Sequence, residues 1–197
     1  IVGRNECQWS LGFNISNIGS KMSYNGGNEP AFLPTNLRLG TMFMFPLADY
    51  HSLALSVDVN KLLVPAKPRL TDFEDQIAYE DALQDWKDMS PIAGVFNSFT
   101  DAPGGAKEEL REINYSIGAE YNYNQQFFLR GGYYHESTYK GNRQYFGLGA
   151  GFALNIVRLD AAYMIATAQS SPLDQTLRFS LTFDMDGLTN LFGIDIK

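Results

Sequence analysis

The chain has few of the residues on which most catalytic and metal sites depend. Among its 197 residues are one cysteine, Cys7, and two histidines, His51 and His135, which lie far apart in the sequence. A single thiol forms no internal disulfide, and no spacing of Cys, His, Asp and Glu resembles a zinc site. No Gly-x-Ser-x-Gly elbow is present, and the glycine-rich run 147–151 falls inside an expected strand. We therefore expect no enzyme, no cofactor and no metal.

Basic residues are also in the minority. The chain has 15 Lys and Arg against 22 Asp and Glu, which gives a net charge of -7. Because nucleic-acid binding needs an excess of positive charge on one face, this balance argues against a nucleic-acid partner. No run approaches the roughly 18 apolar residues of a membrane-spanning helix. The chain starts at Ile1 with no export signal, as expected of a mature form or a fragment.

What the sequence does contain is an alternation of apolar and polar residues with a period of two, together with many aromatic residues and glycines. This pattern predicts β-strands along nearly the whole chain. The strands that we expect cover residues 9–16, 37–45, 52–60, 112–123, 127–136, 146–154, 157–165 and 176–183.

The predicted connections alternate between short and long. Short links are expected at 47–50, 124–126 and 155–156, and longer ones at 24–35, 64–111, 136–142 and 168–174. This asymmetry is typical of outer-membrane barrels, whose short turns are periplasmic and whose long loops are extracellular. Within 64–111, Thr71 to Glu74 form a possible capping box, and the segment after it is a plausible short helix with Phe73, Ile77, Leu83 and Trp86 on one side.

The two faces of the predicted strands differ in chemistry. Alternation alone fits a soluble barrel or sandwich, but strands of about 10 to 12 residues are long for soluble sheets and match a tilted bilayer crossing. We therefore assign the apolar face to lipid. The other face mixes small and charged residues, which predicts an ion-pair network inside a lumen rather than a general acid and base. Its predicted members are Arg38, Asp58, Glu120, Arg130, Arg158, Asp160 and Arg178.

Several short motifs occur together and in order. They are NISNIGSK at 14–21, FLPTNLRLG at 32–40, FTDAPGG at 99–105, EEL at 108–110, YHES at 134–137 and KGNRQYF at 140–146. In these motifs the chain resembles the PorV (LptO) family of the type IX secretion system. The resemblance implies an all-β fold, an antiparallel transmembrane β-barrel of the FadL-like superfamily. That barrel has fourteen strands, of which this chain would supply roughly the C-terminal eight.

The resemblance also implies a domain layout, a location and a function. Residues 1–197 would form a single outer-membrane barrel domain that lacks its N-terminal strands, with 64–111 as a long extracellular loop containing a short helix. The protein would lie in a Gram-negative outer membrane and would bind secreted proteins that bear the system's C-terminal signal domain. It would receive this cargo from the SprA-type translocon and carry it to the PorU-type attachment complex, where the transpeptidase chemistry belongs to PorU.

We expect partner binding in the predicted outer loops, because the cargo is extracellular and these loops are rich in aromatic and turn residues. The chosen residues are Phe96, Phe99, Pro103, Gly104, Gly105, Tyr139, Lys140, Gly141 and Asn142. The main alternative is a FadL-like transporter of a hydrophobic small molecule, with an apolar pocket or opening lined by residues such as Phe128 and Tyr134. A second alternative is a soluble lipocalin-like binder.

Overall fold

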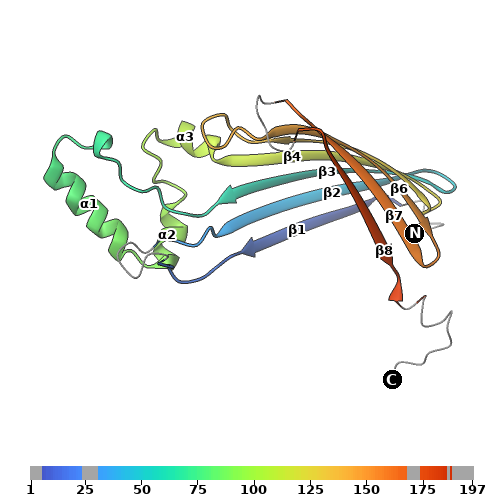
Figure 1. Ribbon diagram of the computed structural model, residues 1–197, viewed down its shortest axis with the longest axis horizontal. Helices are drawn as coiled ribbons and strands as arrows, with labels where there is room; N and C mark the ends of the chain where they lie inside the picture. The colour runs from blue at the N-terminus through green and yellow to red at the C-terminus, as the bar shows by residue number, and fades with distance from the viewer. Residues whose placement is uncertain (1–5, 24–30, 168–173, 186, 188–197) are drawn as a thin grey trace, which may run out of the picture. The chain divides into compact units, whose positions relative to one another are not determined.

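The computed structural model describes residues 6–23, 31–167, 174–185 and 187. Eight strands form one sheet in which each strand is hydrogen-bonded to its neighbour in the chain (Figure 1). The neighbouring strands from β4 to β8 pair antiparallel. The all-β prediction is therefore confirmed. The strands are β1 (Gln8–Ser16), β2 (Asn36–Ala48), β3 (His51–Leu62), β4 (Ile113–Tyr123), β5 (Phe127–His135), β6 (Gln144–Leu154), β7 (Val157–Ala166) and β8 (Thr176–Phe183).

The three short links are tight turns, as predicted. Tyr50, Asn124, Gln125 and Asn155 have positive φ angles, which a hairpin turn needs to match the twist of its strands. Asparagine tolerates this backbone conformation better than most residues, so two of these turns, at Asn124 and Asn155, carry a local sequence signal. The expected loops at 24–35 and 168–174 fall mostly outside the described residues.

The strands leave their apolar side chains uncovered. Leu148 at the middle of β6 is 56% exposed, and Leu129, Leu159 and Phe179 on nearby strands are also exposed. Within the described part of the chain, the buried hydrophobic residues are only Leu63, Ala102 and Phe128. The described residues therefore form no hydrophobic core against the apolar face of the sheet. A soluble sandwich would require such a core.

The connection between β3 and β4 is helical. It contains a 3-10 turn η1 (Leu70–Asp72) and the helices α1 (Gln76–Asp88), α2 (Pro91–Asn97) and α3 (Ala106–Arg111). The predicted helix is present as α1, but the predicted start is wrong, because Thr71 lies in η1. The carboxylate of Asp75 accepts a 2.7 Å hydrogen bond from Ala78 N and caps the helix instead. Helices α2 and α3 were not predicted.

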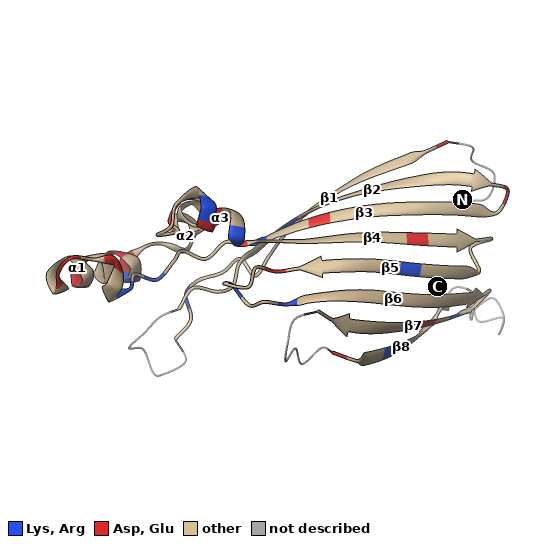
Figure 2. Cartoon of the chain, turned by 90° about the horizontal axis from the view of Figure 1, so that it is seen from above, with Lys and Arg blue, Asp and Glu red and all other residues tan. Residues whose placement is uncertain are grey.

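Charge is distributed unevenly between strands and helices. Charged residues are sparse along the strands and frequent on α1 (Figure 2). No helix among the described residues is long and apolar enough to cross a membrane. Contacts within the chain divide it into two compact units. The first contains residues 1–11, 40–58 and 115–197, and the second contains residues 12–39 and 59–114. The organisation of residues 1–197 as a single domain stays a prediction.

Candidate functional site

Helix α2 carries the first of the predicted partner-binding residues. Ser90 caps it by accepting a 3.2 Å hydrogen bond from Ala93 N, and Pro91 occupies its first turn, where a missing N–H costs nothing. The sequence pair Ser-Pro was therefore a start signal for a helix that the periodicity did not reveal. Phe96 lies on this helix, and Phe99 follows two residues after its end.

One side of α2 packs against the chain, and the side chains on its other side are exposed. Gly94 is buried, and a Cβ atom added there would come within 2.6 Å of Phe32 Cε1 and 3.2 Å of Pro65. On the opposite side, Ile92 and Phe96 are 70% and 71% exposed. Residues four apart lie next to each other on a helix surface, so these two side chains form one apolar ridge. Sequence reasoning chose Phe96 but missed Ile92, although their i, i+4 spacing was the signal.

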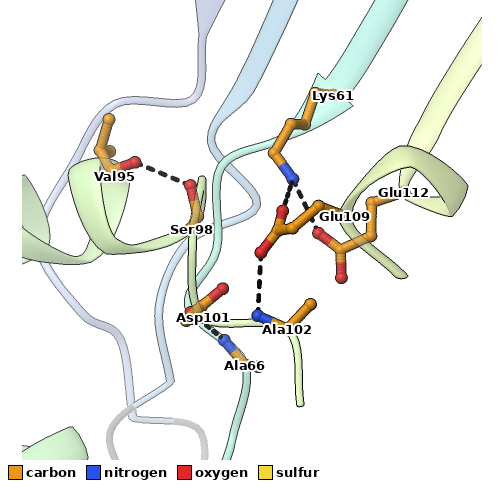
Figure 3. Close-up of polar contacts among 8 residues, drawn as sticks. All are labelled: Lys61, Ala66, Val95, Ser98, Asp101, Ala102, Glu109 and Glu112. Atoms are coloured by element: carbon orange, nitrogen blue, oxygen red, sulfur yellow. Dashed lines mark hydrogen bonds and ion pairs between the residues drawn. The ribbon is translucent and has the colours of Figure 1, made fainter. Parts of the chain in front are cut away.

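A buried lysine holds the segment that contains Pro103, Gly104 and Gly105 (Figure 3). Lys61 Nζ donates to Glu109 Oε2 and Glu112 Oε2, both at 2.8 Å, and the lysine side chain is only 9% exposed. The second oxygen of Glu109 accepts a 2.8 Å hydrogen bond from Ala102 N. The strand end at Lys61 thereby fixes both α3 and the turn before it. We call Lys61, Glu109 and Glu112 the lysine cluster.

Asp101 fixes the other end of the same turn. Its Oδ2 accepts a 2.7 Å hydrogen bond from Ala66 N. Burial raises the pKa of Asp101, and the Ala66 hydrogen bond opposes that shift. Nearby, Gly104 N donates to Glu108 at 2.8 Å. The predicted residues Pro103 to Gly105 thus belong to a braced turn, not to a loose loop.

The remaining predicted partner-binding residues lie between β5 and β6, in the other compact unit. Lys140 N and Asn142 N both donate to Ser137 O at 3.0 Å, which closes a tight loop. Gly141 has φ +139, and a Cβ there would come within 2.5 Å of a Glu136 oxygen, so only glycine fits. Tyr139 at the tip is exposed.

An arginine clamps the base of this loop. Glu136 is buried and accepts hydrogen bonds from Arg143 Nε at 2.7 Å, from Nη2 at 2.8 Å and from the Arg143 backbone at 3.1 Å. These bonds lower the pKa of Glu136 from its ordinary value of 4.5, although burial opposes the shift. The Glu136 carboxylate therefore contributes its full stabilisation of the folded loop above its ordinary pKa of 4.5. That stabilisation is lost as the pH falls through the lowered pKa of Glu136.

We expect a nitroxide label in a Tyr139→Cys, Cys7→Ser variant to show an ordered loop near neutral pH and to become mobile below the ordinary pKa of Glu136, 4.5. The measurement is an electron paramagnetic resonance titration from about pH 7 to about pH 2. Adding Glu136→Gln should make the label mobile at neutral pH and remove most of the pH dependence. A label that stays equally ordered across the whole range in both proteins would contradict the clamp.

Four of the predicted lumen residues form one connected ion-pair cluster. Arg130 Nε donates to Glu120 Oε2 at 2.5 Å, and Arg130 Nη1 donates to Asp160 Oδ1 at 2.6 Å. Arg158 Nε donates to the second oxygen of Asp160 at 2.8 Å. The two guanidiniums also lie 5.1 and 4.5 Å from the ring centroid of buried Phe128. We call Glu120, Arg130, Arg158 and Asp160 the arginine cluster.

The three other predicted lumen residues lie outside this network. Arg38 is on β2, Asp58 on β3 and Arg178 on β8, and none has a salt bridge to a described residue. Phe128 is enclosed by the arginine cluster and Tyr134 stacks on Tyr145 at 5.1 Å. Neither is among the residues that line the hollow on the charged face of β4 to β8, and the transporter alternative stays a prediction.

No group of His, Cys, Asp and Glu that could hold a metal ion occurs in the described ranges. No curated protein matches the chain. Residues 3–69, which include β1, β2 and β3, match the model of a family described as type IX secretion system protein PorV. Over its first three strands, the chain is therefore similar to the PorV family of the type IX secretion system.

Proposed function

We propose that this chain is a non-enzymatic outer-membrane component of the type IX secretion system. It binds cargo bearing the C-terminal signal domain as the cargo leaves an SprA-type translocon, and it carries that cargo to a PorU-type attachment complex. The observation that carries the proposal is the match of residues 3–69 to the PorV family. The binding of cargo is supported by the exposed ridge of Ile92 and Phe96 and by the ordered loop between β5 and β6.

The exposed apolar face of the sheet supports a membrane location. Water would contact side chains such as Leu129, Leu148 and Phe179 in a soluble protein, whereas hydrocarbon tails would cover them in a bilayer. Within hydrocarbon the backbone groups of every strand must be paired, so the sheet functions in a closed barrel. The arginine cluster then faces the lumen, and the long connections, including 64–111, are extracellular.

The ridge of Ile92 and Phe96 supports a role in cargo binding. Exposed apolar side chains held on a rigid element are typical of the central contacts of protein interfaces. Gly94 fixes α2 from behind, and the lysine cluster braces the segment that follows, which contains Phe99 and Pro103 to Gly105. The loop of Tyr139 to Asn142, clamped by Arg143, offers a second rigid surface. Both surfaces are ordered before binding, which lowers its entropic cost.

Replacing Ile92 and Phe96 together by serine should weaken cargo binding by about 30-fold, the effect of losing one interface hot spot. The measurement is titration of the purified protein with a fluorescent signal domain. Ile77→Ser on α1 is a matched control, because Ile77 is equally exposed but lies on another helix. It should bind as the wild type does.

Deletion of residues 96–105 tests the same surface more severely. Signal-domain capture should be lost while the barrel still assembles, as judged by heat-modifiable migration in electrophoresis. Unchanged capture by an assembled deletion variant would exclude this loop as the cargo site. Loss of assembly in the double serine variant would instead assign the ridge a structural role.

A further inference from the structure

The apolar face of the sheet changes its chemistry in one row, at the strand ends that lead into the long connections. Tyr115, His135 and Gln144 are paired directly across β4, β5 and β6, and Thr167 N extends this row by donating to Gln144 O at 2.9 Å. All four side chains can form hydrogen bonds, whereas the same face carries residues such as Leu148 at the middle of the strands. Such a row is typical of the level at which a lipid-facing surface meets the head groups.

The rings of this row are held in place by one another. His135 stacks on Tyr115 with ring centroids 4.8 Å apart, and Tyr133 Oη lies 3.3 Å from His135 Nδ1 and 3.4 Å from Gln144 Oε1. The Tyr133 hydroxyl has one hydrogen for these two acceptors, and when it donates to His135 Nδ1, the imidazole carries its own hydrogen on Nε2. His135 Nε2 and Tyr115 Oη have no partner among the described residues. We call Tyr115, Tyr133 and His135 the His135 cluster.

Positive charge lies beside the His135 cluster. The loop 136–143 contains two basic residues, Lys140 and Arg143, against one acidic residue, Glu136, in a chain whose net charge is -7. Arg143 directly precedes Gln144, and its side chain is mostly exposed although it pairs with Glu136. Arginine and tyrosine are both common donors to phosphate oxygens. The surroundings of the cluster therefore favour an anion.

The other histidine provides an internal comparison at the opposite end of the strands. His51 Nδ1 lies 2.6 Å from Tyr121 Oη, and the His51 ring lies 4.9 Å from the ring of Tyr123. The short links 47–50, 124–126 and 155–156 contain no Lys or Arg, and Asp49 is two residues before His51. The same kinds of side chain thus meet at both ends, but cations accompany only the His135 cluster.

From the outward donors of the His135 cluster and the cations beside it, we propose that this cluster binds the phosphate of a lipid head group. His135 Nε2 and Tyr115 Oη donate to the phosphate oxygens, and Arg143 supplies positive charge. The acyl chains cover the adjoining apolar face, at residues such as Ile117 and Phe146, which is why the phosphate belongs to a lipid. The inference rests on the proposed membrane location and is independent of cargo binding.

The test uses the complete protein, purified in a neutral detergent and stripped of lipid. Dioleoyl phosphatidic acid is the probe, and dioleoylglycerol is its counterpart, with the same acyl chains and no phosphate. Native mass spectrometry measures the lipid that the protein retains as the mole fraction of each lipid in the micelles rises. Phosphatidic acid should half-saturate the protein at a mole fraction at least about 10-fold lower, since a hydrogen bond to a charged group contributes a factor of that size.

Two double variants separate the His135 cluster from other lipid contacts. Tyr115→Phe, His135→Phe keeps both rings and removes both donors, and it should lose most of the preference for phosphatidic acid. His51→Phe, Tyr121→Phe makes the same change at the other end of the strands and should bind as the wild type does. Heat-modifiable migration verifies assembly of both.

A second measurement needs no substitution, because the chain has only two histidines. In the wild-type protein labelled with 15N-histidine, phosphatidic acid should shift the imidazole signals of His135 in the NMR spectrum and leave those of His51 in place. This readout stands even if the double phenylalanine variant fails to assemble.

Three results would overturn the proposal. The first is an unchanged preference for phosphatidic acid in assembled Tyr115→Phe, His135→Phe, or signals of His135 that do not move. The second is equal binding of the two lipids, which removes the role of the phosphate. The third is full displacement of phosphatidic acid by inorganic phosphate at comparable concentration, which shows that the acyl chains contribute nothing. If the wild type still inserts into dioleoyl phosphatidylcholine bilayers, any of these results removes this site and leaves the membrane location intact.

Discussion

Replacing Lys61 by methionine should release the segment from Asp101 to Glu112 from its place on β3. The substitution keeps the length and apolar stem of the side chain but removes the ammonium group that Glu109 and Glu112 share. Both carboxylates are largely buried, and breaking a buried ion pair by removing one partner costs about 3 to 5 kcal/mol. Hydrogen exchange of the amides of 101–112 should therefore show local opening at least about 100-fold more frequent than in the wild type.

The matched control neutralises the partners as well. In a Lys61→Met, Glu109→Gln, Glu112→Gln variant the three positions of the lysine cluster carry no charge, and glutamine at 109 can still accept from Ala102 N. Much of the protection should return. If the free energy of local opening in Lys61→Met lies within about 0.5 kcal/mol of the wild-type value, the lysine cluster does not hold this segment. Cargo binding should fall in the single variant and recover in the triple one, because the turn before α3 is part of the proposed surface.

The strands could be predicted from the sequence because their signals are local. The alternation of apolar residues has a period that only a strand matches, and it continues through all eight segments. The turns carry asparagine at several of the positions that need a positive φ. Each strand also pairs with the next one in the chain, so no long-range pairing had to be guessed.

The helical connection was harder to predict, because its structure depends on contacts between distant residues. Helix α2 has seven residues and is buried only at Gly94, so it shows no apolar stripe of useful length. Lys61 follows a strand pattern that gives no hint of its partners 48 and 51 residues later. The start of α1 was misplaced because the Thr71 to Glu74 motif resembles a capping box, whereas Asp75 alone makes the cap.

The sequence predicted which charged residues share one face of the sheet, but it did not predict the contacts between them. Sequence position shows that Glu120 and Arg130 occupy the same face, and their direct pairing follows from the register of β4 and β5. The link from Arg130 to Asp160 crosses β6 at Gly151, where a Cβ would lie 3.1 Å from Arg130 Nη1. Only the register reveals why a glycine is needed there. Without the register, the sequence could not show that the arginine cluster leaves out Arg38, Asp58 and Arg178.

The assignment of the outer face to lipid is tested most directly at Leu148. This residue lies at the middle of β6 with its side chain exposed, and Leu148→Arg places a charge where we expect the bilayer centre. An arginine on the lipid face near the midplane costs about 2 to 4 kcal/mol. An exposed substitution in a water-covered sheet typically changes stability by no more than about 0.5 kcal/mol. The two environments therefore predict clearly different results for the same change.

Met164→Arg is the matched control, because Met164 pairs with Gly147 on the opposite face and methionine is close to arginine in length. A charge on that face points into the proposed lumen and should have little effect on the free energy of unfolding in lipid bilayers. We expect Leu148→Arg to lower that free energy by about 3 kcal/mol and to reduce the heat-modifiable fraction. Equal tolerance of both variants would place water, not lipid, against the apolar face, and the membrane location and the secretion function would then both fail.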